Sequence, residues 1–324
     1  MFEGTQVVIV IPCYRVGEHI EQVIEFLPHW VDNIVAVNDC CPEGTGEALA
    51  RIQDPRLKII TLKENKGVGG AMLAGYAEAL DLGGNIIIKM DGDGQMDPAY
   101  LEDLIAPVAF LGYGYAKGNR FLHDKQLQRM PSVRLWGNIV LTFLTKIASG
   151  YWNVFDPQNG YTVISRWALE SINLEELDRR YFFENQMLVL LNTRMVPVAD
   201  VPIPARYGNE TSSLRIGIVL KSFPGLLVKG FLTRLWRRHV ILDFSPLIPL
   251  LVAGIVFIAF GAVFGGYHWI KSIVTNVPAT SGTVMLAVLP LIIGAQVILQ
   301  AILIDIASVP KADVSSQTIR IHPN

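Results

Sequence analysis

The sequence predicts an α/β fold with a mainly parallel, doubly wound sheet, followed by a hairpin of two apolar helices. Three observations carry this prediction. Short runs of β-branched residues alternate with helical patterns in the first part of the chain. Polar residues follow several of these runs directly. Two long uncharged apolar stretches come after residue 245.

The composition argues against a nucleic-acid-binding protein. The 324 residues carry a formal net charge of −2, which provides no basic field for a phosphate backbone. Hydrophobic residues make up 51% of the chain, and the excess collects after residue 245. The three cysteines, Cys13, Cys40 and Cys41, have neither zinc spacing nor the even count of a disulfide framework. We therefore expect a reducing, cytosolic setting for the first part, and the short apolar run ended by Pro12 is no signal peptide.

Four strands are expected to alternate with helices before the first acidic motif. Each strand is a short apolar run, typical of burial on both faces: Val7–Ile11, Ile34–Val37, Leu57–Leu62 and Ile86–Met90. The first helix carries its apolar residues on one face, at Ile20, Val23, Ile24 and Leu27. A second helix follows the turn at residues 42–46. A third spans Ala71–Leu80, after a glycine-rich turn.

The segment Asp91-Gly92-Asp93-Gly94-Gln95 follows the fourth strand and brings two carboxylates to its carboxyl end. Open α/β sheets bind ligands at that edge. Paired carboxylates suit Mg²⁺ or Mn²⁺ held together with a substrate phosphate. The competing interpretation is a plain Asp-Gly turn between two elements.

Three other polar groups are expected at the same edge, because each also follows a strand: Tyr14, Asp39 and the Lys66-Gly67 turn. Each has an ordinary explanation as well. Tyr14 could be a packing aromatic, and Asp39 could cap the next helix. The glycines at 67, 69 and 70 form neither G-x-G-x-x-G nor a Walker loop. It is the convergence of all these groups that favours a binding site.

In their order and spacing, four segments resemble the motifs of family 2 glycosyltransferases: Pro12-Cys13-Tyr14, Asn38–Glu43, Asn65–Ala71 and Asp91–Gln95. The resemblance implies a GT-A-type, Rossmann-like domain that binds a nucleotide sugar. It also implies Mg²⁺ or Mn²⁺ on Asp91, Asp93 and Gln95, with Asp91 and Asp93 in catalytic roles. The donor contacts that it implies are Pro12, Tyr14, Asp39, Lys66, Gly67, Asp91 and Arg206.

The chain departs from the family pattern at three places. Asn38 replaces an acidic residue, Cys40-Cys41 replaces Gly-Ser, and Arg15-Val16-Gly17 replaces Asn-Glu-Glu. In the family these positions surround the base and ribose of the donor. Uridine and guanosine donors therefore both remain open.

The second half of the resemblance concerns the acceptor. Tyr115–Lys117 is expected to be a strand leading to Arg120, and Val133–Ala148 a helix. In the dolichyl-phosphate mannose synthase-like branch, which transfers sugars to polyprenyl phosphates, matching residues hold the acceptor phosphate. The resemblance gives this role to Arg120, Arg134, Asn138 and Ser213. Guanidinium groups suit phosphate oxygens, although a surface ion pair is the ordinary alternative for each arginine.

Three further features belong to the same resemblance. Asp156 lies in a segment that the family places beside the reaction centre, and it is the nearest candidate for a general base. Glu184 matches a Phe-x-x-Glu position, but could simply complement a helix dipole. Arg206 lies in a Gly- and Ser-containing loop that could close over the diphosphate, although the lysine usual in this loop is missing.

The end of the chain is expected to cross a membrane twice. Residues 246–267 and 283–305 are long enough to span a hydrocarbon core of ~30 Å. Residues 1–213 form the expected cytoplasmic transferase domain, 214–245 an amphipathic juxtamembrane segment, and 306–324 a cytoplasmic tail. Basic residues before the first span outnumber those between the spans, which places the domain inside. Asp305 is expected to remain solvated at the cytoplasmic end.

Together these features predict metal-dependent, inverting transfer of a sugar from a UDP- or GDP-hexose to a polyprenyl phosphate at the inner membrane. The product would be a lipid-linked monosaccharide for envelope glycans or protein glycosylation. A phosphate acceptor is already anionic, so no general base is required. Two alternatives remain open: a transferase that extends an envelope polysaccharide or glycolipid, and a non-catalytic scaffold that binds nucleotide sugar. We also leave a homo-oligomer open.

Overall fold

The computed structural model describes residues 1–121, 132–204 and 216–312, and the side chains of residues 132–136 and 216–221 lie outside that description. The chain forms two compact units. One consists of Met1–Arg234 together with the residues from Pro310, and the other is Leu235–Val309. Each unit is described by itself below.

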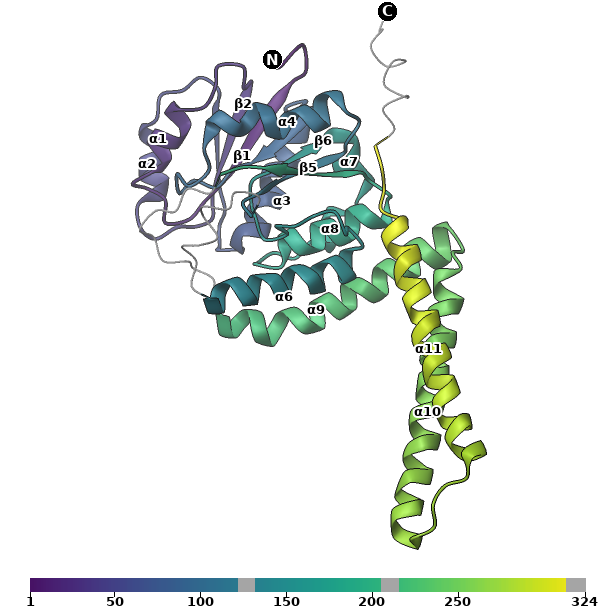
Figure 1. Cartoon of the computed structure of the whole chain (residues 1–324). Coiled ribbons are helices and arrows are strands. Elements are labelled where there is room, and N and C mark those ends of the chain that lie inside the picture. Colours follow the sequence, from purple (N-terminus) through teal and green to yellow (C-terminus); the bar gives the residue numbers. More distant parts are fainter. Residues whose placement is uncertain (122–131, 205–215, 313–324) are drawn as a thin grey trace, which may run out of the picture. The chain divides into compact units, whose positions relative to one another are not determined.

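The first unit is built on a seven-stranded sheet (Figure 1). Its strands are β1 (Val7–Cys13), β2 (Asn33–Asn38), β3 (Leu57–Thr61), β4 (Ile86–Lys89), β5 (Tyr115–Asn119), β6 (Thr162–Ser165) and β7 (Val198–Pro202). Their order is β3-β2-β1-β4-β6-β5-β7. β6 runs antiparallel to both of its neighbours, and the other pairs are parallel. The predicted mainly parallel sheet is confirmed.

Helices cover both faces of this sheet, as expected for a doubly wound fold. On one face, alternate β1 residues such as Ile9 share a core with α1 (Ile20–Glu25), α2 (Thr45–Arg51) and α4 (Leu101–Phe110). On the other face, α3 (Gly67–Asp81) lies directly against β1. The period-two pattern of β1 therefore sends its side chains into two separate layers.

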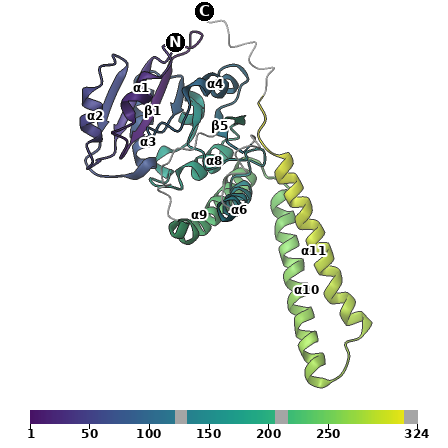
Figure 2. The same ribbon diagram turned by 60° about the vertical axis from the view of Figure 1, so that its left-hand side comes forward.

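The remaining helices of this unit are α6 (Ser132–Ser149), α7 (Arg166–Ser171), α8 (Phe183–Thr193) and α9 (Ile216–Trp236), with short 3₁₀ turns at Pro98–Tyr100 and Leu174–Glu176. Figures 1 and 2 both show α9 alongside α6. Phe223 and Leu227 of α9 pack with Ala148 and Phe182. The fully buried Arg234 donates to the carbonyl oxygens of Ile147 and Ala148, which satisfies acceptors at the end of α6.

The glycine-rich segment is the first turn of α3 and not a separate turn, so the helix starts four residues earlier than the expected Ala71. The reason is steric. A Cβ on Gly69 would lie 2.1 Å from the carbonyl oxygen of Asp178, and one on Gly70 would lie 2.3 Å from Cβ of Lys66. Glycine here admits the backbone of a distant loop against the helix start, which overrides its low helix propensity.

The second unit contains α10 (Leu247–Thr275) and α11 (Ser281–Ala307), preceded by a π-helical turn at Arg237–Leu242. Both long helices are apolar enough to cross a membrane. They pack closely at small residues, since a Cβ on Gly254 would lie 2.5 Å from Cγ1 of Ile298. α10 continues to Thr275, past the expected end of the first span at residue 267, so Trp269 belongs to the helix.

Two polar residues of the second unit differ from expectation. Asp305 is buried rather than solvated, and its Oδ1 lies 3.7 Å from Nε2 of His239. Arg238, one of the basic residues counted toward orientation, is also buried and donates to the carbonyl oxygen of Ser308. Sequence pattern alone could not reveal that Asp305 lies beside His239 and that Arg238 binds a backbone carbonyl inside the unit.

The contact between α3 and β1 yields a stability prediction. A Cβ on Gly75 would lie 2.1 Å from Cγ1 of Val10 and 3.3 Å from Cγ2 of Val37. Gly75→Ala should therefore lower the thermal stability of the full chain in detergent, with an overpacking cost of about 1–3 kcal/mol. Gly137→Ala on α6 is the control, because nothing lies within 4 Å of its Cβ position. Equal melting temperatures for the two variants would contradict this packing.

Candidate active site

The predicted ligand-binding edge is present. Tyr14, Asp39 and Asp91 follow β1, β2 and β4, which are neighbouring parallel strands. Arg120 follows β5, which runs in the same direction as β4 because β6 is antiparallel to both. All four residues therefore lie at one edge of the sheet. Tyr14 is exposed there, and Pro12 is the half-buried penultimate residue of β1.

Asp39 holds the start of α3. Its Oδ1 accepts the backbone N–H of Lys66 at 2.7 Å, and its Oδ2 accepts that of Gly67 at 2.8 Å. Burial raises the pKa of this carboxyl, although the two backbone donors favour its charged form. The capping alternative is thus partly right, but the helix concerned is α3 and not the next one in the chain. A donor-binding role for Asp39, Lys66 and Gly67 stays a prediction.

Asp91 and Asp93 form a short acidic turn after β4. Oδ1 of Asp91 accepts a hydrogen bond from Nζ of Lys89 at 2.7 Å, and Oδ1 of Asp93 accepts the backbone N–H of Gln95 at 3.0 Å. The turn needs space beside it. A Cβ on Gly160 would lie 2.8 Å from Oδ2 of Asp91 and 2.3 Å from Nζ of Lys89. No other residue type fits at position 160 unless this contact changes.

The donor set suits a metal that arrives with its substrate. Within the described ranges, no group of three or more His, Cys, Asp or Glu side chains is placed to hold a metal ion. The two carboxylates of Asp91 and Asp93 are partly exposed. Mg²⁺ is commonly bound through one or two carboxylates plus substrate phosphates rather than by a complete protein cage. The pair fits that mode, and a ligand role for the Gln95 side chain stays a prediction.

Two buried lysines beneath this edge were missed as site residues. Lys89 is 1% exposed, and its Nζ contacts Asp91, the carbonyl oxygen of Gly160 at 3.2 Å and Oε1 of Glu184 at 3.5 Å. Burial alone would lower the pKa of Lys89, but the two carboxylates outweigh it and raise that pKa. Lys117 on β5 donates to the carbonyl oxygen of Asn159, and burial lowers its pKa to about 8. A lysine inside an apolar strand was the signal that could have identified them.

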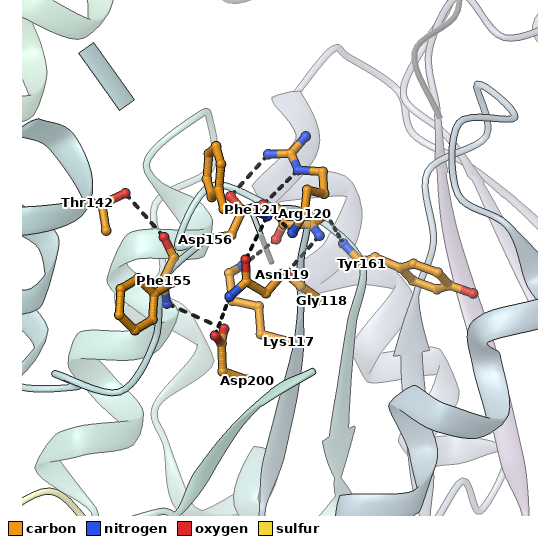
Figure 3. Close-up of polar contacts among 11 residues, drawn as sticks. Lys117, Gly118, Asn119, Arg120, Phe121, Thr142, Phe155, Asp156, Tyr161 and Asp200 are labelled. Atoms are coloured by element: carbon orange, nitrogen blue, oxygen red, sulfur yellow. Dashed lines mark hydrogen bonds and ion pairs between the residues drawn. The ribbon is translucent and has the colours of Figure 1, made fainter. Parts of the chain in front are cut away.

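Arg120 and Asp156 form a bidentate pair, shown in Figure 3. Nε of Arg120 lies 2.7 Å from Oδ2 of Asp156, and Nη2 lies 3.1 Å from Oδ1. Asp156 is buried, while the Arg120 side chain remains one-third exposed. The carboxylate therefore holds the guanidinium at the edge of the site. This geometry favours a positioning role for Asp156 over the predicted general-base role.

Asp200 on β7 supports the same region. The side chain of Asn119 donates to its carboxylate, and the backbone N–H of Phe155 approaches Oδ1 at 3.4 Å (Figure 3). Burial raises the pKa of Asp200 to about 6, and the hydrogen bond from Asn119 opposes that rise. Asp200 thus joins the strand that leads to Arg120 with the loop that carries Asp156. It follows no motif in the sequence, so sequence reasoning had no signal for it.

For some predicted residues, the position relative to the site is not described. Arg206 and Ser213 lie outside the described residues. Arg134 is in α6, as the predicted helix required, but its side chain is not described. Asn138 is one turn further along α6 and half-buried. Their roles at an acceptor phosphate remain predictions.

Two of the three departures from the family pattern contact each other. The Cys41 sulfur accepts hydrogen bonds from the backbone N–H of Arg15 at 3.2 Å and from the Thr45 hydroxyl at 3.2 Å. Partial burial opposes ionisation, but these donors prevail and lower the pKa of Cys41. Arg15 itself has φ +59°, a left-handed conformation that is uncommon outside glycine. The segment after Tyr14 and the segment around Cys41 are therefore joined through the Cys41 sulfur atom.

The raised pKa of Asp200 gives a pH prediction. Its folded-state value of about 6 exceeds the unfolded value of about 3.9, so folding binds the proton. Asp200 therefore contributes stability that is fully present below the unfolded pKa and is lost as the pH rises through about 6. In Asp200→Asn this dependence should disappear from thermal unfolding of the full chain between these values. Glu18→Gln, at an exposed carboxyl, is the control, and parallel profiles for Asp200→Asn and the native chain would refute the assignment.

Comparisons with known proteins identify the family of the chain. The model of the family described as Glycosyl transferase family 2 matches residues 8–172. The chain is 29% identical over 214 residues to the UDP-N-acetylglucosamine–dolichyl-phosphate N-acetylglucosaminyltransferase of Methanococcus voltae, covering 61% of this chain and 85% of that enzyme. It is 25% identical over 203 residues to the undecaprenyl-phosphate mannosyltransferase of Micrococcus luteus, covering 61% and 82%.

The fold is also found among solved structures. Glucosyl-3-phosphoglycerate synthase from Mycobacterium tuberculosis, in complex with Mg²⁺ and UDP, superposes with a TM-score of 0.52 at 17% identity, covering 72% of this chain and 80% of that one. At this identity the likeness concerns the fold alone, and it confirms the GT-A-like architecture. The family match, which includes β1 to β6 and the Asp91–Asp93 turn, spans about half of the chain. The chain therefore belongs to glycosyltransferase family 2.

Proposed function

We propose that the protein transfers a sugar from a nucleotide sugar to a polyprenyl phosphate, with inversion at the anomeric carbon. The observation that carries the proposal is the loop Asp156–Gly160. At one end Asp156 binds Arg120, and at the other the Gly160 carbonyl binds Lys89, which in turn binds Asp91. A carboxylate pair suited to a diphosphate-bound cation and a guanidinium suited to a second phosphate are thus held by one short segment.

The relatives support the choice of substrates. One transfers N-acetylglucosamine from its UDP derivative to dolichyl phosphate, and another is an undecaprenyl-phosphate mannosyltransferase. The structural neighbour was crystallised with Mg²⁺ and UDP. We infer a UDP- or GDP-hexose donor, Mg²⁺ or Mn²⁺ as cofactor, and a polyprenyl phosphate acceptor. The departures around Cys41 leave the choice between the two nucleotides open.

The proposed chemistry needs electrostatic stabilisation more than proton transfer. A divalent cation on Asp91 and Asp93 would offset the charge that develops on the departing nucleoside diphosphate. Arg120 would draw the acceptor phosphate toward the anomeric carbon, held in direction by Asp156. The acceptor oxygen is already anionic, so its attack requires no base. This agrees with Asp156 being occupied by Arg120.

The membrane location belongs to the same proposal. α6 and α9 expose apolar side chains in the part of the chain that is described, among them Ile139, Val140, Phe143, Val228 and Leu232. Such a face suits the headgroup layer. Together with α10 and α11 as two spans, it would bring a lipid phosphate to the catalytic domain at the cytoplasmic face of the inner membrane. The product would be a lipid-linked monosaccharide for envelope glycans or protein glycosylation.

The first test removes one proposed metal carboxylate. Asp93→Asn should reduce formation of chloroform-extractable sugar lipid at least about a hundredfold, since metal stabilisation of the leaving group is worth several kcal/mol. The assay uses the full chain in detergent, labelled UDP- and GDP-sugars, a short polyprenyl phosphate, and Mg²⁺ or Mn²⁺. Glu18→Gln is the control. Full turnover by Asp93→Asn would overturn the metal assignment, and product on a polysaccharide instead of a lipid would favour a chain-extending transferase.

A second test addresses the acceptor. Arg120→Lys keeps the positive charge but loses the planar fork that pairs with Asp156 and suits a phosphate. The KM for the polyprenyl phosphate should rise about tenfold, corresponding to about 1.4 kcal/mol, with the donor KM little changed. Arg166→Lys, whose guanidinium pairs with Glu170, is the matched control. A rise confined to the KM for the nucleotide sugar would mean that Arg120 binds the donor and not the acceptor phosphate.

A further inference from the structure

We propose that Lys89, clamped by Glu184, is a positioning residue that fixes the Asp91 carboxylate for the divalent cation of the donor. The inference rests on the proposed function, because it assumes that Asp91 binds that cation. The inference goes beyond the proposed function by assigning a role to Lys89 and Glu184, which do not belong to the acidic turn. It also connects two motifs that the sequence presents separately, Asp91-Gly92-Asp93 and Phe183-Glu184.

The first argument is hydrogen-bond geometry. A lysine ammonium has three N–H donors, and three oxygens surround Nζ of Lys89. They are Oδ1 of Asp91 at 2.7 Å, the Gly160 carbonyl at 3.2 Å and Oε1 of Glu184 at 3.5 Å. With every donor directed at an oxygen, the ammonium has little freedom to reorient. The carboxylate that it holds most closely is the one at the proposed metal site.

The second argument is energetic. Lys89 ends a strand whose other residues, Ile86, Ile87 and Ile88, are all apolar and buried. Replacing a buried ion pair with well-packed apolar residues is often neutral or stabilising. Apolar side chains at positions 89 and 184 together would therefore satisfy the fold equally well. The ammonium is explained better by what it does to Asp91 than by what it contributes to the core.

The third argument concerns Glu184 in the first turn of α8. Its side chain is 13% exposed and directed at Lys89 rather than at solvent. Complementing the helix dipole does not require burial next to a lysine. Glu184 instead provides the second negative charge around the ammonium. It holds the Lys89 ammonium in place, so that Lys89 can fix Asp91.

Two effects of removing the ammonium oppose each other, which makes the proposal testable. Loss of a positive charge beside the site would by itself tighten cation binding. Loss of the contact would release the Asp91 carboxylate and weaken binding. Removing the partner that orients a metal ligand typically lowers metal affinity roughly 10- to 100-fold. A positioning residue predicts weakening despite the more negative site, whereas a simple counter-ion predicts tightening.

The experiment measures Mn²⁺ binding to the full chain in detergent, with saturating UDP and separately with GDP, by electron paramagnetic resonance of free Mn²⁺. In Lys89→Met the dissociation constant should increase roughly 10- to 100-fold, while thermal unfolding shows a folded protein. Lys58→Met is the matched control, since Lys58 pairs with Glu78 on an exposed surface and its loss changes the net charge equally. Its Mn²⁺ affinity should match the native value.

Unchanged or tighter Mn²⁺ binding by folded Lys89→Met would overturn the proposal. If that variant does not fold, Glu184→Asp decides, because it keeps the negative charge and shortens the side chain that reaches Lys89. Weaker Mn²⁺ binding by Glu184→Asp then supports the proposal, and native affinity overturns it. If the native protein binds Mn²⁺ with a nucleotide but makes no lipid product, the proposed function is wrong and this inference still holds. Native protein that binds no Mn²⁺ with either nucleotide would overturn the inference itself.

Discussion

Three basic side chains hold the loop Asp156–Gly160, and the arrangement of the site depends on that clamp. Arg120 binds the Asp156 carboxylate, Lys117 the Asn159 carbonyl and Lys89 the Gly160 carbonyl. These residues come from β5 and β4, which are separated by β6. The loop leads directly into β6, and its contacts link the carboxyl ends of β4 and β5. The proposed cation site and the proposed acceptor arginine therefore cannot move independently of it.

Burying this much charge is costly, and the surrounding groups show how the cost is offset. Lys89 lies between two carboxylates, which favour its charged form. Lys117 is less well compensated, and burial lowers its pKa to about 8, while burial raises that of nearby Asp200 to about 6. A buried network is stable only when each member keeps its partners. Substitution of one member should therefore disturb the others as well.

The sequence predicted the sheet, the strands up to β5, the two long apolar helices and the edge at which Tyr14, Asp39 and Asp91 lie. Periodicity and strand-end position determine those features. It could not predict the antiparallel β6, because strand direction depends on pairing partners distant in the chain. Nor could it show that Asp156 is occupied by Arg120, or that Lys89 contacts Glu184. Those contacts join residues from different elements, and only the Tyr181–Glu184 and Asp91–Asp93 patterns at their ends are visible locally.

The part of the edge beside Tyr14 presents a different problem, since its unusual residues contact each other. Arg15 and Cys41 lie far apart in the chain, yet the Arg15 backbone donates to the Cys41 sulfur, and Glu43 pairs with the Arg15 side chain at 2.9 Å. The left-handed backbone of Arg15 turns the segment beside Tyr14 toward that sulfur. The serine of the family pattern at position 41 would be smaller and would accept from these donors with an oxygen instead of a sulfur. In the proposed donor site, the nucleotide base would contact a surface whose shape depends on the Cys41 thiol. Selectivity between uracil and guanine should then depend on both the Arg15 segment and the Cys41 segment rather than on either one alone.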